Sequence, residues 1–325
     1  MIFKKDPLQI IPFLTYGTGN HLYLRGRALE DEDIDLSKKG WFNLLLNSWR
    51  RFETDEIRNT PVTIKVKEQC FELATDPEGY YLLDESTFVK SQTDSEGWLT
   101  YEVAFNTSLK RQIQLNNSFE GQMLVPSNEA KFGVISDIDD TILHTGVTSR
   151  LKWKVVVNTL FKTPLKRKAL EGTADFYDLL HNTVNPIFYV SNSPWNLYRY
   201  LEFFLSSNNF PKGPILLRDF RTPFDKTPKP ELAHKYHEVF NILETYPHLR
   251  FILIGDCGEK DAYIYLDVVK KFPNRIAAIY LRSVEHKKRM KRIENLFEDY
   301  SEIPVLIVDN SAQAISHAKQ YGFIN

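Results

Sequence analysis

The pattern of hydrophobic and polar residues changes near residue 128. Before that point, short runs alternate between apolar and polar residues, and turn-rich segments separate them. Alternation with a period of two is typical of half-buried strands. The predicted strands are 21–25, 62–67, 80–83, 98–105 and 122–125. We therefore expect residues 1–127 to form a β-rich, sandwich-like domain.

Two segments of this upstream part add detail. Large apolar residues recur at helical spacing over residues 39–54, which predicts one helix packed into a core. The segment Glu72–Tyr81 resembles the strand–turn–strand corner of transthyretin-like and other immunoglobulin-like modules. Neither segment by itself indicates a binding function.

From residue 128 onward, apolar runs alternate with segments of helical periodicity. The predicted strands are 132–136, 187–191, 215–217, 251–255, 276–281 and 305–308, and the predicted helices are 195–207, 231–246 and 285–300. Strands that alternate with helices are typical of an α/β fold with a doubly wound parallel sheet. We expect this domain to occupy residues 128–325, with the linker inside residues 124–130.

Composition limits the functional classes. A chain of 325 residues is long enough for two domains. Its net charge of -1 provides no global positive field, so nucleic acid is not an expected partner. Two cysteines are too few for a disulfide framework and favour a reducing compartment. Because the sequence shows no secretory signal and no apolar run of membrane-spanning length, we expect a soluble, cytoplasmic protein.

Two carboxylates follow the first strand of the predicted parallel sheet. Phe132–Ser136 is apolar and leads directly into Asp137, with Asp139 two positions later. Ligands of open α/β sheets bind at the carboxyl ends of strands, where both side chains would emerge. Such close carboxylates repel each other unless a cation or a shared proton balances them, and Mg²⁺ prefers oxygen ligands of this kind. The alternative is a solvated acidic turn.

Other polar residues follow later elements of this domain. Ser191 ends the strand 187–191, and Ser193 with Pro194 predicts the start of a helix, where a phosphate oxygen could bind. Asp256 ends the strand 251–255, and Lys235 lies in the first turns of the helix 231–246. Individually, these residues are also explained as a helix cap, a turn and a solvated lysine.

In combination, these segments match the order of the four sequence motifs of the haloacid dehalogenase superfamily. The sequence resembles most closely the catalytic domain of the actin-patch type of phosphatidate phosphatase, through Asp137–Val147, Tyr189–Leu197, His234–Lys235 and Phe251–Asp256. The resemblance covers about residues 130–325, and Leu24–Leu29 resembles the β-rich leader of related chains. It implies a haloacid dehalogenase-like Rossmannoid fold and phosphatase activity.

The resemblance also implies a role for each matching residue. Asp137 is the expected nucleophile, which forms an aspartyl-phosphate, and Asp139 is the expected general acid and base. Thr141 would orient the loop after the first strand. The expected phosphoryl-binding residues are Ser191, Asn192 and Lys235. The expected Mg²⁺ ligands are Asp137, the backbone carbonyl of Asp139 and Asp256, with Asp261 nearby or acting through water.

Some positions leave alternatives open. Lys226 and Lys229 compete with Lys235 for the lysine role. Related sequences often have Ser-Gly after the motif aspartate and Asp-Pro further on, whereas this chain has Cys257-Gly258 and Asp261-Ala262. A thiol beside a metal site is either oxidation-sensitive or an inert small residue.

Two segments are rich in basic residues. The first lies between Asp140 and Glu171, contains no acidic residue, and carries Arg150, Lys152, Lys154, Lys162, Lys166, Arg167 and Lys168. It forms either a lip that engages anionic lipid headgroups or a solvated helical face. The second, His286–Arg292, favours a solvated helical face. Arg282 ends a predicted strand and is a candidate for the mouth of the site.

The leading hypothesis is a Mg²⁺-dependent phosphomonoesterase acting on phosphatidic acid or another anionic phospholipid, peripherally at a membrane. One alternative keeps this chemistry but assigns a soluble phosphomonoester or a nucleic-acid end as the substrate. Another is a non-enzymatic adaptor, whose β-rich domain binds a protein partner and whose phosphatase fold is vestigial. All the expected catalytic residues are present, which favours an enzyme.

Overall fold

The computed structural model describes residues 7–30, 57–89, 93–106, 112–142, 170–218, 233–258, 260–284 and 287–325. The chain divides into two compact units, Met1–Val125 and Pro126–Asn325. Two predictions, the helix at 39–54 and the basic segment between Asp140 and Glu171, lie mostly or wholly outside the described residues. No helix in the described part is long and apolar enough to cross a membrane.

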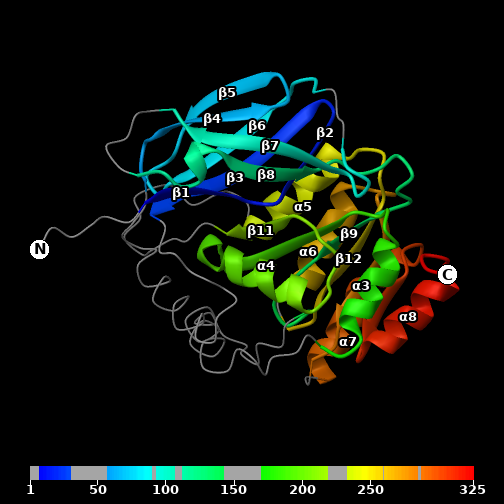
Figure 1. Ribbon diagram of the computed structural model, residues 1–325. Coiled ribbons are helices and arrows are strands. Elements are labelled where there is room, and N and C mark those ends of the chain that lie inside the picture. The colour runs from blue at the N-terminus through cyan, green and yellow to red at the C-terminus, as the bar shows by residue number, and fades with distance from the viewer. Residues whose placement is uncertain are drawn as a thin grey trace, which may run out of the picture. The chain divides into compact units, whose positions relative to one another are not determined.

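The first unit is built from strands (Figure 1). They are β1 (Leu8–Pro12), β2 (Thr15–Thr18), β3 (His21–Glu30), β4 (Pro61–Val66), β5 (Gln69–Ala74), β6 (Tyr80–Glu85), β7 (Trp98–Phe105) and β8 (Phe119–Leu124), with a short 3-10 helix, η1 (Gln114–Asn117). The β-rich prediction is therefore confirmed. Strands β1 and β2 are not among those named in the sequence analysis, whereas the end of β5 lies in its predicted strand–turn–strand corner.

One hydrogen-bonded sheet contains all eight of these strands. Its order is β1-β3-β2-β8-β7-β4-β5, and β6 also pairs with β3. Side chains with 0% exposure, including Leu22, Leu24, Val62, Ile64 and Val103, form the core of this unit. They occupy alternate positions of their strands, as the period-two pattern predicts.

The turn between β5 and β6 lies in the predicted corner. Asp76 Oδ1 accepts hydrogen bonds from the backbone N–H groups of Glu78 (2.8 Å) and Tyr80 (2.9 Å). Gly79 has φ 82°, a left-handed conformation that glycine adopts without a steric cost. The carboxylate and the glycine together reverse the chain at this point.

The second unit alternates strands and helices (Figure 1). Its strands are β9 (Gly133–Ser136), β10 (Ile187–Pro194), β11 (Ile215–Arg218), β12 (Phe251–Asp256), β13 (Ile276–Arg282) and β14 (Val305–Val308). Its helices are α3 (Thr173–His181), η3 (Trp195–Leu197), α4 (Tyr198–Ser207), α5 (His234–Thr245), α6 (Asp261–Lys271), α7 (Lys287–Leu296), η4 (Glu298–Tyr300) and α8 (Ser311–Gln320).

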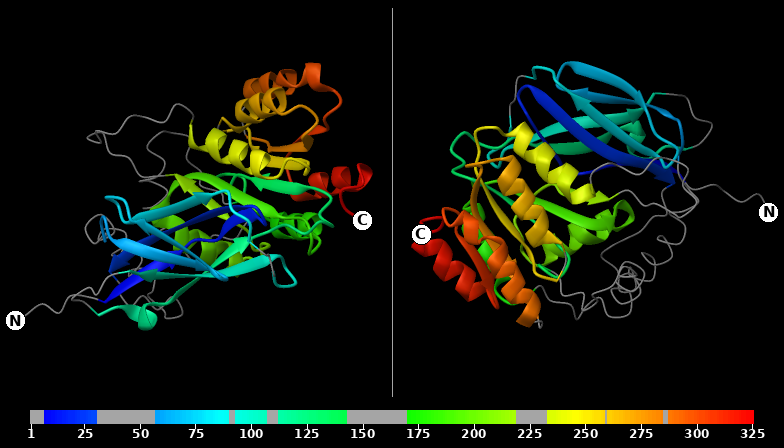
Figure 2. Two further views of the ribbon diagram at one scale, coloured as in Figure 1. Left: turned by 90° about the horizontal axis from the view of Figure 1, so that it is seen from above. Right: turned by 180° about the vertical axis from the view of Figure 1, so that it is seen from behind.

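All six strands are parallel, in the order β11-β10-β9-β12-β13-β14, which confirms the predicted parallel α/β sheet. Helices α5, α6 and α7 cover one face, and α3, α4 and α8 cover the other (Figures 1 and 2). Because both faces are covered, the central strands are continuously apolar and buried. The strand order reverses at β9, which places a topological switch point between β9 and β12.

The predicted helix start at Ser193 is wrong. Strand β10 continues to Pro194, which pairs with Arg218 of β11 and has an extended backbone (φ -74°, ψ 154°). A 3-10 turn follows, and α4 begins only at Tyr198. Ser193 therefore belongs to the strand, and its hydroxyl can contact a residue that follows the neighbouring strand β9.

Candidate active site

Three buried aspartates meet at the switch point. Asp137 follows β9, Asp256 ends β12, and Asp261 begins α6; their exposures are 1%, 0% and 0%. One carboxylate oxygen from each lies within 4.8 Å of the others. The backbone N–H of Asp137 donates to the carbonyl of Ile254 (2.9 Å), so the pairing of β9 with β12 directly fixes the first aspartate beside the second.

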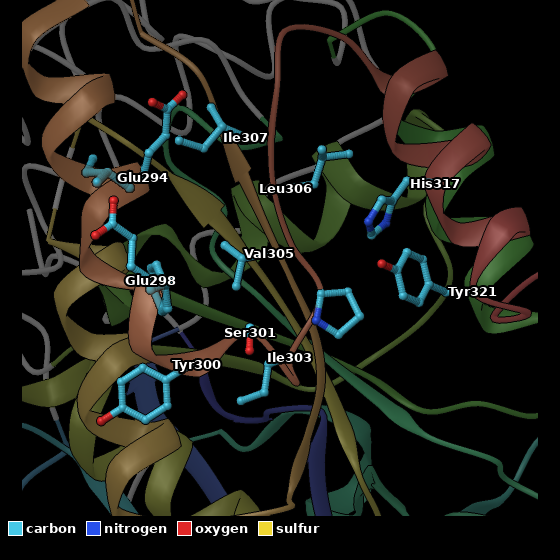
Figure 3. A pocket seen from close by; sticks show the side chains of 13 residues that line it. Glu294, Glu298, Tyr300, Ser301, Ile303, Val305, Leu306, Ile307, His317 and Tyr321 are labelled. Carbon is cyan, nitrogen blue, oxygen red and sulfur yellow. The ribbon is translucent and has the colours of Figure 1, made fainter.

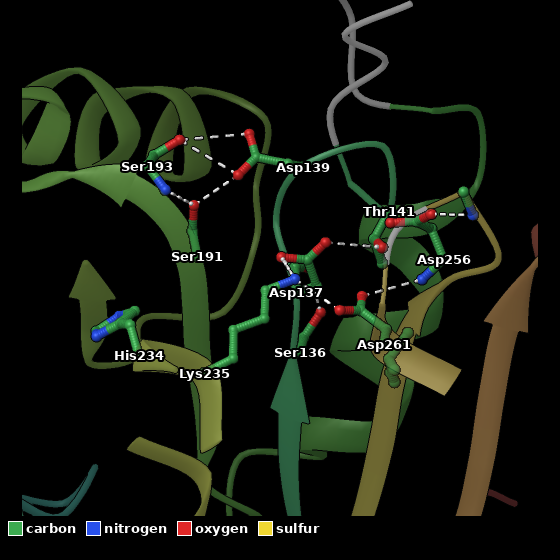
Figure 4. Close-up of polar contacts among 12 residues, drawn as sticks. Ser136, Asp137, Asp139, Thr141, Ser191, Ser193, His234, Lys235, Asp256 and Asp261 are labelled. Carbon is green, nitrogen blue, oxygen red and sulfur yellow. Dashed lines mark hydrogen bonds and ion pairs between the residues drawn. The ribbon is translucent and has the colours of Figure 1, made fainter. Parts of the chain in front are cut away.

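Lys235 joins this aspartate cluster from the first turn of α5 (Figure 4). Its Nζ lies 2.8 Å from Asp137 Oδ1 and 2.7 Å from Asp261 Oδ1, and the residue is 3% exposed. The structure thus places Lys235 at the site, as expected. Its competitors Lys226 and Lys229 lie outside the described residues.

The charges of the cluster suit a divalent cation. Three carboxylates are held together out of water, and the single ammonium of Lys235 balances at most one of them. Such an excess of buried negative charge is unfavourable unless further positive charge binds. All donors at the cluster are oxygens, the ligands that Mg²⁺ prefers. Asp137, Asp256 and Asp261 therefore fit the magnesium site implied by the sequence.

Asp139 forms a second polar group with two serines (Figure 4). Ser191 Oγ donates to Asp139 Oδ2 at 2.6 Å, and Ser193 Oγ contacts the same oxygen at 3.2 Å. The backbone N–H of Ser193 donates to Ser191 Oγ at 2.8 Å. In the described part of the chain, the side chain of Asp139 is not a member of the three-aspartate metal group.

Two other predicted residues lie differently. Thr141 is buried, and its Oγ1 lies 3.5 Å from Asp137 Oδ2, at the limit of a hydrogen bond. The loop reaches this position because Asp140 is left-handed (φ 56°), and the Ile142 N–H then donates to the carbonyl of Ile138 (3.0 Å). Asn192 is exposed, whereas its neighbours on the strand are buried. Strand alternation directs Asn192 away from the face that holds Ser191 and Ser193.

Several supporting residues were not predicted. Ser136 Oγ donates to the carbonyl of Asp137 (2.7 Å) and contacts the hydroxyl of Tyr177, while Tyr265 donates to the carbonyl of Ile254 (2.7 Å). Burial raises the pKa of both tyrosines, so they stay neutral and can donate. The position of Ser136 at the strand end is a sequence signal, but nothing in the pattern identifies the tyrosines.

Gly255 allows α6 to approach β12. A Cβ at this position would lie 2.6 Å from Asp261 Oδ2 and 2.8 Å from Asp261 Cβ. No side chain fits there without moving Asp261. The Gly-Asp motif therefore needs glycine for a steric reason, because Asp261 packs closely against the strand at this point.

Cys257 follows Asp256 and is fully buried. Burial, together with the charge of Asp256, raises the pKa of its thiol to about 12. Thiol reactivity requires the thiolate and access to the reagent, and Cys257 has neither. Of the two alternatives that the sequence left open, these properties favour an inert small residue over an oxidation-sensitive thiol.

A separate pocket of about 510 Å³ follows the edge strand β14 (Figure 3). Its lining includes Glu294, Glu298, Leu306, His317 and Tyr321. The two glutamates make it unsuitable for a phosphate-bearing ligand, because like charges repel. The aspartate cluster with Lys235 remains the better candidate site for such a ligand.

Comparison with known proteins shows what this part of the chain is similar to. Residues 132–283 match the family model described as phosphatidate phosphatase APP1, catalytic domain. Asp137, Asp139, Ser191, Lys235, Asp256 and Asp261 all lie inside the matched range. The resemblance recognised in the motifs is confirmed for this part of the chain.

Two curated relatives match beyond that range. Phosphatidate phosphatase APP1 of Saccharomyces cerevisiae is 32% identical over 241 residues, which cover 71% of this chain and 39% of the relative. An uncharacterized protein of Schizosaccharomyces pombe is 30% identical over 215 residues, 66% of this chain and 34% of that protein. The chain therefore spans little more than a third of the length of either relative. A carbohydrate acetylesterase structure from Xanthomonas citri has 10% identity to this chain and a TM-score of 0.26. The aligned part covers 88% of this chain and 73% of the acetylesterase chain. The two structures are too dissimilar for the comparison to bear on the fold.

Substitution of Gly255 tests the packing of Asp261. We expect Gly255→Ala to lower the free energy of unfolding by about 1–3 kcal/mol, the usual cost of overpacking. If Mg²⁺ binds the three aspartates, it should raise Tm, and the rise should be smaller in Gly255→Ala because Asp261 is displaced. Gly322→Ala is the control: it introduces left-handed strain (φ 70°) in open space and should leave the Mg²⁺-dependent rise intact. Equal Mg²⁺ responses in both variants would contradict this account.

The two thiols should differ in reactivity. Cys70 is exposed, whereas Cys257 is buried and its raised pKa keeps the thiol in the unreactive protonated form at pH 8. We expect Ellman's reagent to modify one thiol rapidly in the native protein, none in Cys70→Ser, and both thiols of the original chain after denaturation. Rapid labelling of native Cys70→Ser would show that Cys257 is reactive.

Proposed function

We propose that the second unit is a Mg²⁺-dependent phosphomonoesterase of the haloacid dehalogenase type, and that its substrate is phosphatidate or a related anionic phospholipid. The observation that carries the proposal is the buried group of Asp137, Asp256, Asp261 and Lys235 at the sheet switch point. The match of residues 132–283 to a phosphatidate phosphatase catalytic domain supports the choice of substrate.

Asp137 is the proposed nucleophile. Lys235 pairs with its Oδ1, and Thr141 Oγ1 lies 3.5 Å from its Oδ2. Attack of a carboxylate oxygen on phosphorus forms an acyl-phosphate bond while the bond from phosphorus to the alcohol oxygen breaks. Lys235 holds the nucleophile in position and offers positive charge to the transferring group, which is the main requirement of phosphoryl transfer.

Asp139 is the proposed general acid and base. Its protonated form gives a proton to the departing alcohol oxygen, and the resulting carboxylate then accepts a proton from the water that hydrolyses the aspartyl-phosphate. This hydrolysis releases inorganic phosphate and restores the free carboxylate of Asp137. Ser191 and Ser193 bind Asp139 away from the ion pair of Lys235 with Asp137 (Figure 4). In this position Asp139 can give its proton to the leaving group.

Mg²⁺ would be held by the carboxylates of Asp137, Asp256 and Asp261, with the backbone carbonyl of Asp139 as a further ligand from the family resemblance. When bound, it supplies positive charge that balances the carboxylates and the charge developing on the phosphoryl oxygens.

Ser193 gains a role from the hydrogen bonds of Ser191. The hydroxyl of Ser191 has one proton, which it donates to Asp139, and it also accepts from the Ser193 N–H. If Ser191 donates to a phosphoryl oxygen of the substrate instead, Ser193 Oγ still contacts Asp139. We therefore expect Ser193 to act as a positioning residue for the general acid.

Replacement of the nucleophile tests the main proposal. We expect Asp137→Asn to reduce Mg²⁺-dependent turnover of para-nitrophenyl phosphate by more than about 10³-fold, because an amide cannot form the acyl-phosphate. The fold should remain, since one of three crowded carboxylates is neutralised. Asp140→Asn is the matched control, because asparagine tolerates the left-handed backbone there. Retained turnover in Asp137→Asn would refute the nucleophile assignment.

Ser193 is tested by the dependence on the leaving group. We expect Ser193→Ala to lower kcat about tenfold on an alkyl phosphate, whose leaving oxygen needs a proton, and to lower it much less on para-nitrophenyl phosphate. Ser193→Thr should restore kcat on the alkyl phosphate because it restores the hydroxyl. A loss of equal size on both substrates would indicate a structural effect and not positioning of Asp139.

A further inference from the structure

The distribution of charged residues along α7 destabilises the helix. Its first six residues, Lys287–Arg292, contain five cations, and the first turn has no acid. Within α7 the acidic residue is Glu294, in the second half of the helix, and Glu298 and Asp299 follow in η4; Glu285 precedes α7 and lies outside the described residues. A helix is stabilised by anions near its N-terminus and cations near its C-terminus, which is the opposite arrangement.

Repulsion within the helix adds to this cost. Lys288 lies three residues before Lys291 and four before Arg292, spacings at which like charges destabilise a helix. Lys288, Lys291 and Arg292 are exposed, and in the described part of the chain none has a carboxylate within ion-pair distance. The helix is held instead by Ile293 and the adjoining Phe297, which are buried. Local violations of this kind are expected where a surface serves a ligand.

This charged part of α7 lies at the edge of the sheet that carries the aspartates. Because α7 follows the parallel strand β13, it begins at the carboxyl edge, where Arg282 of β13 lies in register with Asp256. The positive charge of Arg289 lowers the pKa of the thiol of Cys257, the residue after Asp256, although burial has a larger, opposite effect. The Arg292 guanidinium lies 5.6 Å from the ring centre of Tyr263, in the first turn of α6.

We propose that the cationic face of α7, formed by Lys288, Arg289, Lys291 and Arg292, docks the protein on an anionic membrane surface and so brings the aspartate cluster to its lipid substrate. This inference rests on the proposed function. It differs from the solvated face favoured by the sequence, because the position of α7 at the catalytic edge is a property of the fold.

The character of the face favours a membrane over nucleic acid. Proteins that bind single strands combine basic grooves with aromatic side chains that stack on bases. Among the described aromatic residues near this face, Phe297, which follows α7, is buried, and Tyr300 of η4 is partly buried and lies beyond the acidic residues. The partly buried ring of Tyr263 already lies against the Arg292 guanidinium. A row of exposed basic side chains suits a surface of many phosphates, where attraction is additive and sensitive to salt.

The test compares two triple variants with the same change in charge. Lys288→Gln, Lys291→Gln and Arg292→Gln are combined in one protein. Lys131→Gln, Lys270→Gln and Lys319→Gln are combined in the control; all three lysines are exposed and lie at the amino edge of the same sheet. Co-sedimentation is measured with vesicles of phosphatidylcholine, with and without phosphatidylserine, in the presence of chelator. Phosphatidylserine carries charge but no phosphomonoester, so binding is separated from turnover.

We expect the unaltered protein and the control to bind vesicles that contain phosphatidylserine, with binding lost at high salt. A change of about fivefold per basic residue predicts binding weaker by roughly 100-fold in the α7 variant. Its ratio of turnover on phosphatidate vesicles to turnover on para-nitrophenyl phosphate should also fall. Equal binding by the two variants would overturn the proposal, as would tighter binding of the original protein to single-stranded RNA than to the vesicles.

Failure of this inference is distinguishable from failure of the proposed function. Turnover of para-nitrophenyl phosphate that depends on Asp137, without vesicle binding through α7, would leave the enzyme assignment standing and remove the docking surface. Vesicle binding lost only in the α7 variant, in a protein without phosphatase activity, would keep the surface and remove the enzyme assignment.

Discussion

The ion pairs of Lys235 with Asp137 and Asp261 are the interaction on which the rest of the site depends. They connect a loop after β9, the start of α6 and the start of α5 in one buried contact. Without the ammonium, three carboxylates would be crowded out of water with less positive charge to balance them. The switch point of the sheet, the glycine at 255 and the register of β9 with β12 all serve to bring these groups together.

Much of the second unit was predictable because its signals are local. A parallel sheet covered on both faces requires continuous apolar strands, so each of the six strands was visible as an apolar run, and Asp137 and Asp256 were visible as the residues at which two of those runs stop. Lys235 was harder to identify, since helical lysines are usually solvated. It was chosen only because the other motifs surrounded it in order.

The misses also have physical reasons. Ser193 followed by proline has the sequence of a helix cap, but its strand pairing with β11 extends through Pro194 and turns the hydroxyl toward Asp139. Tyr177 and Tyr265 reach the site from helices far along the chain, and no spacing rule relates them to it. Strands β1 and β2 have only five and four residues, and neither alternates regularly between buried and more exposed positions, so neither gives a clear period-two pattern.

The central position of β9 has a consequence for how the second unit is made. This strand is the first of its sheet to leave the ribosome, yet its neighbours are β10 and β12, and the residues that balance Asp137 come from α5 and α6. Until those later segments exist, the nascent chain exposes an apolar strand without the neighbours that it has in the finished sheet. Non-local assembly of this kind is slow, and it leaves the unfinished chain open to aggregation.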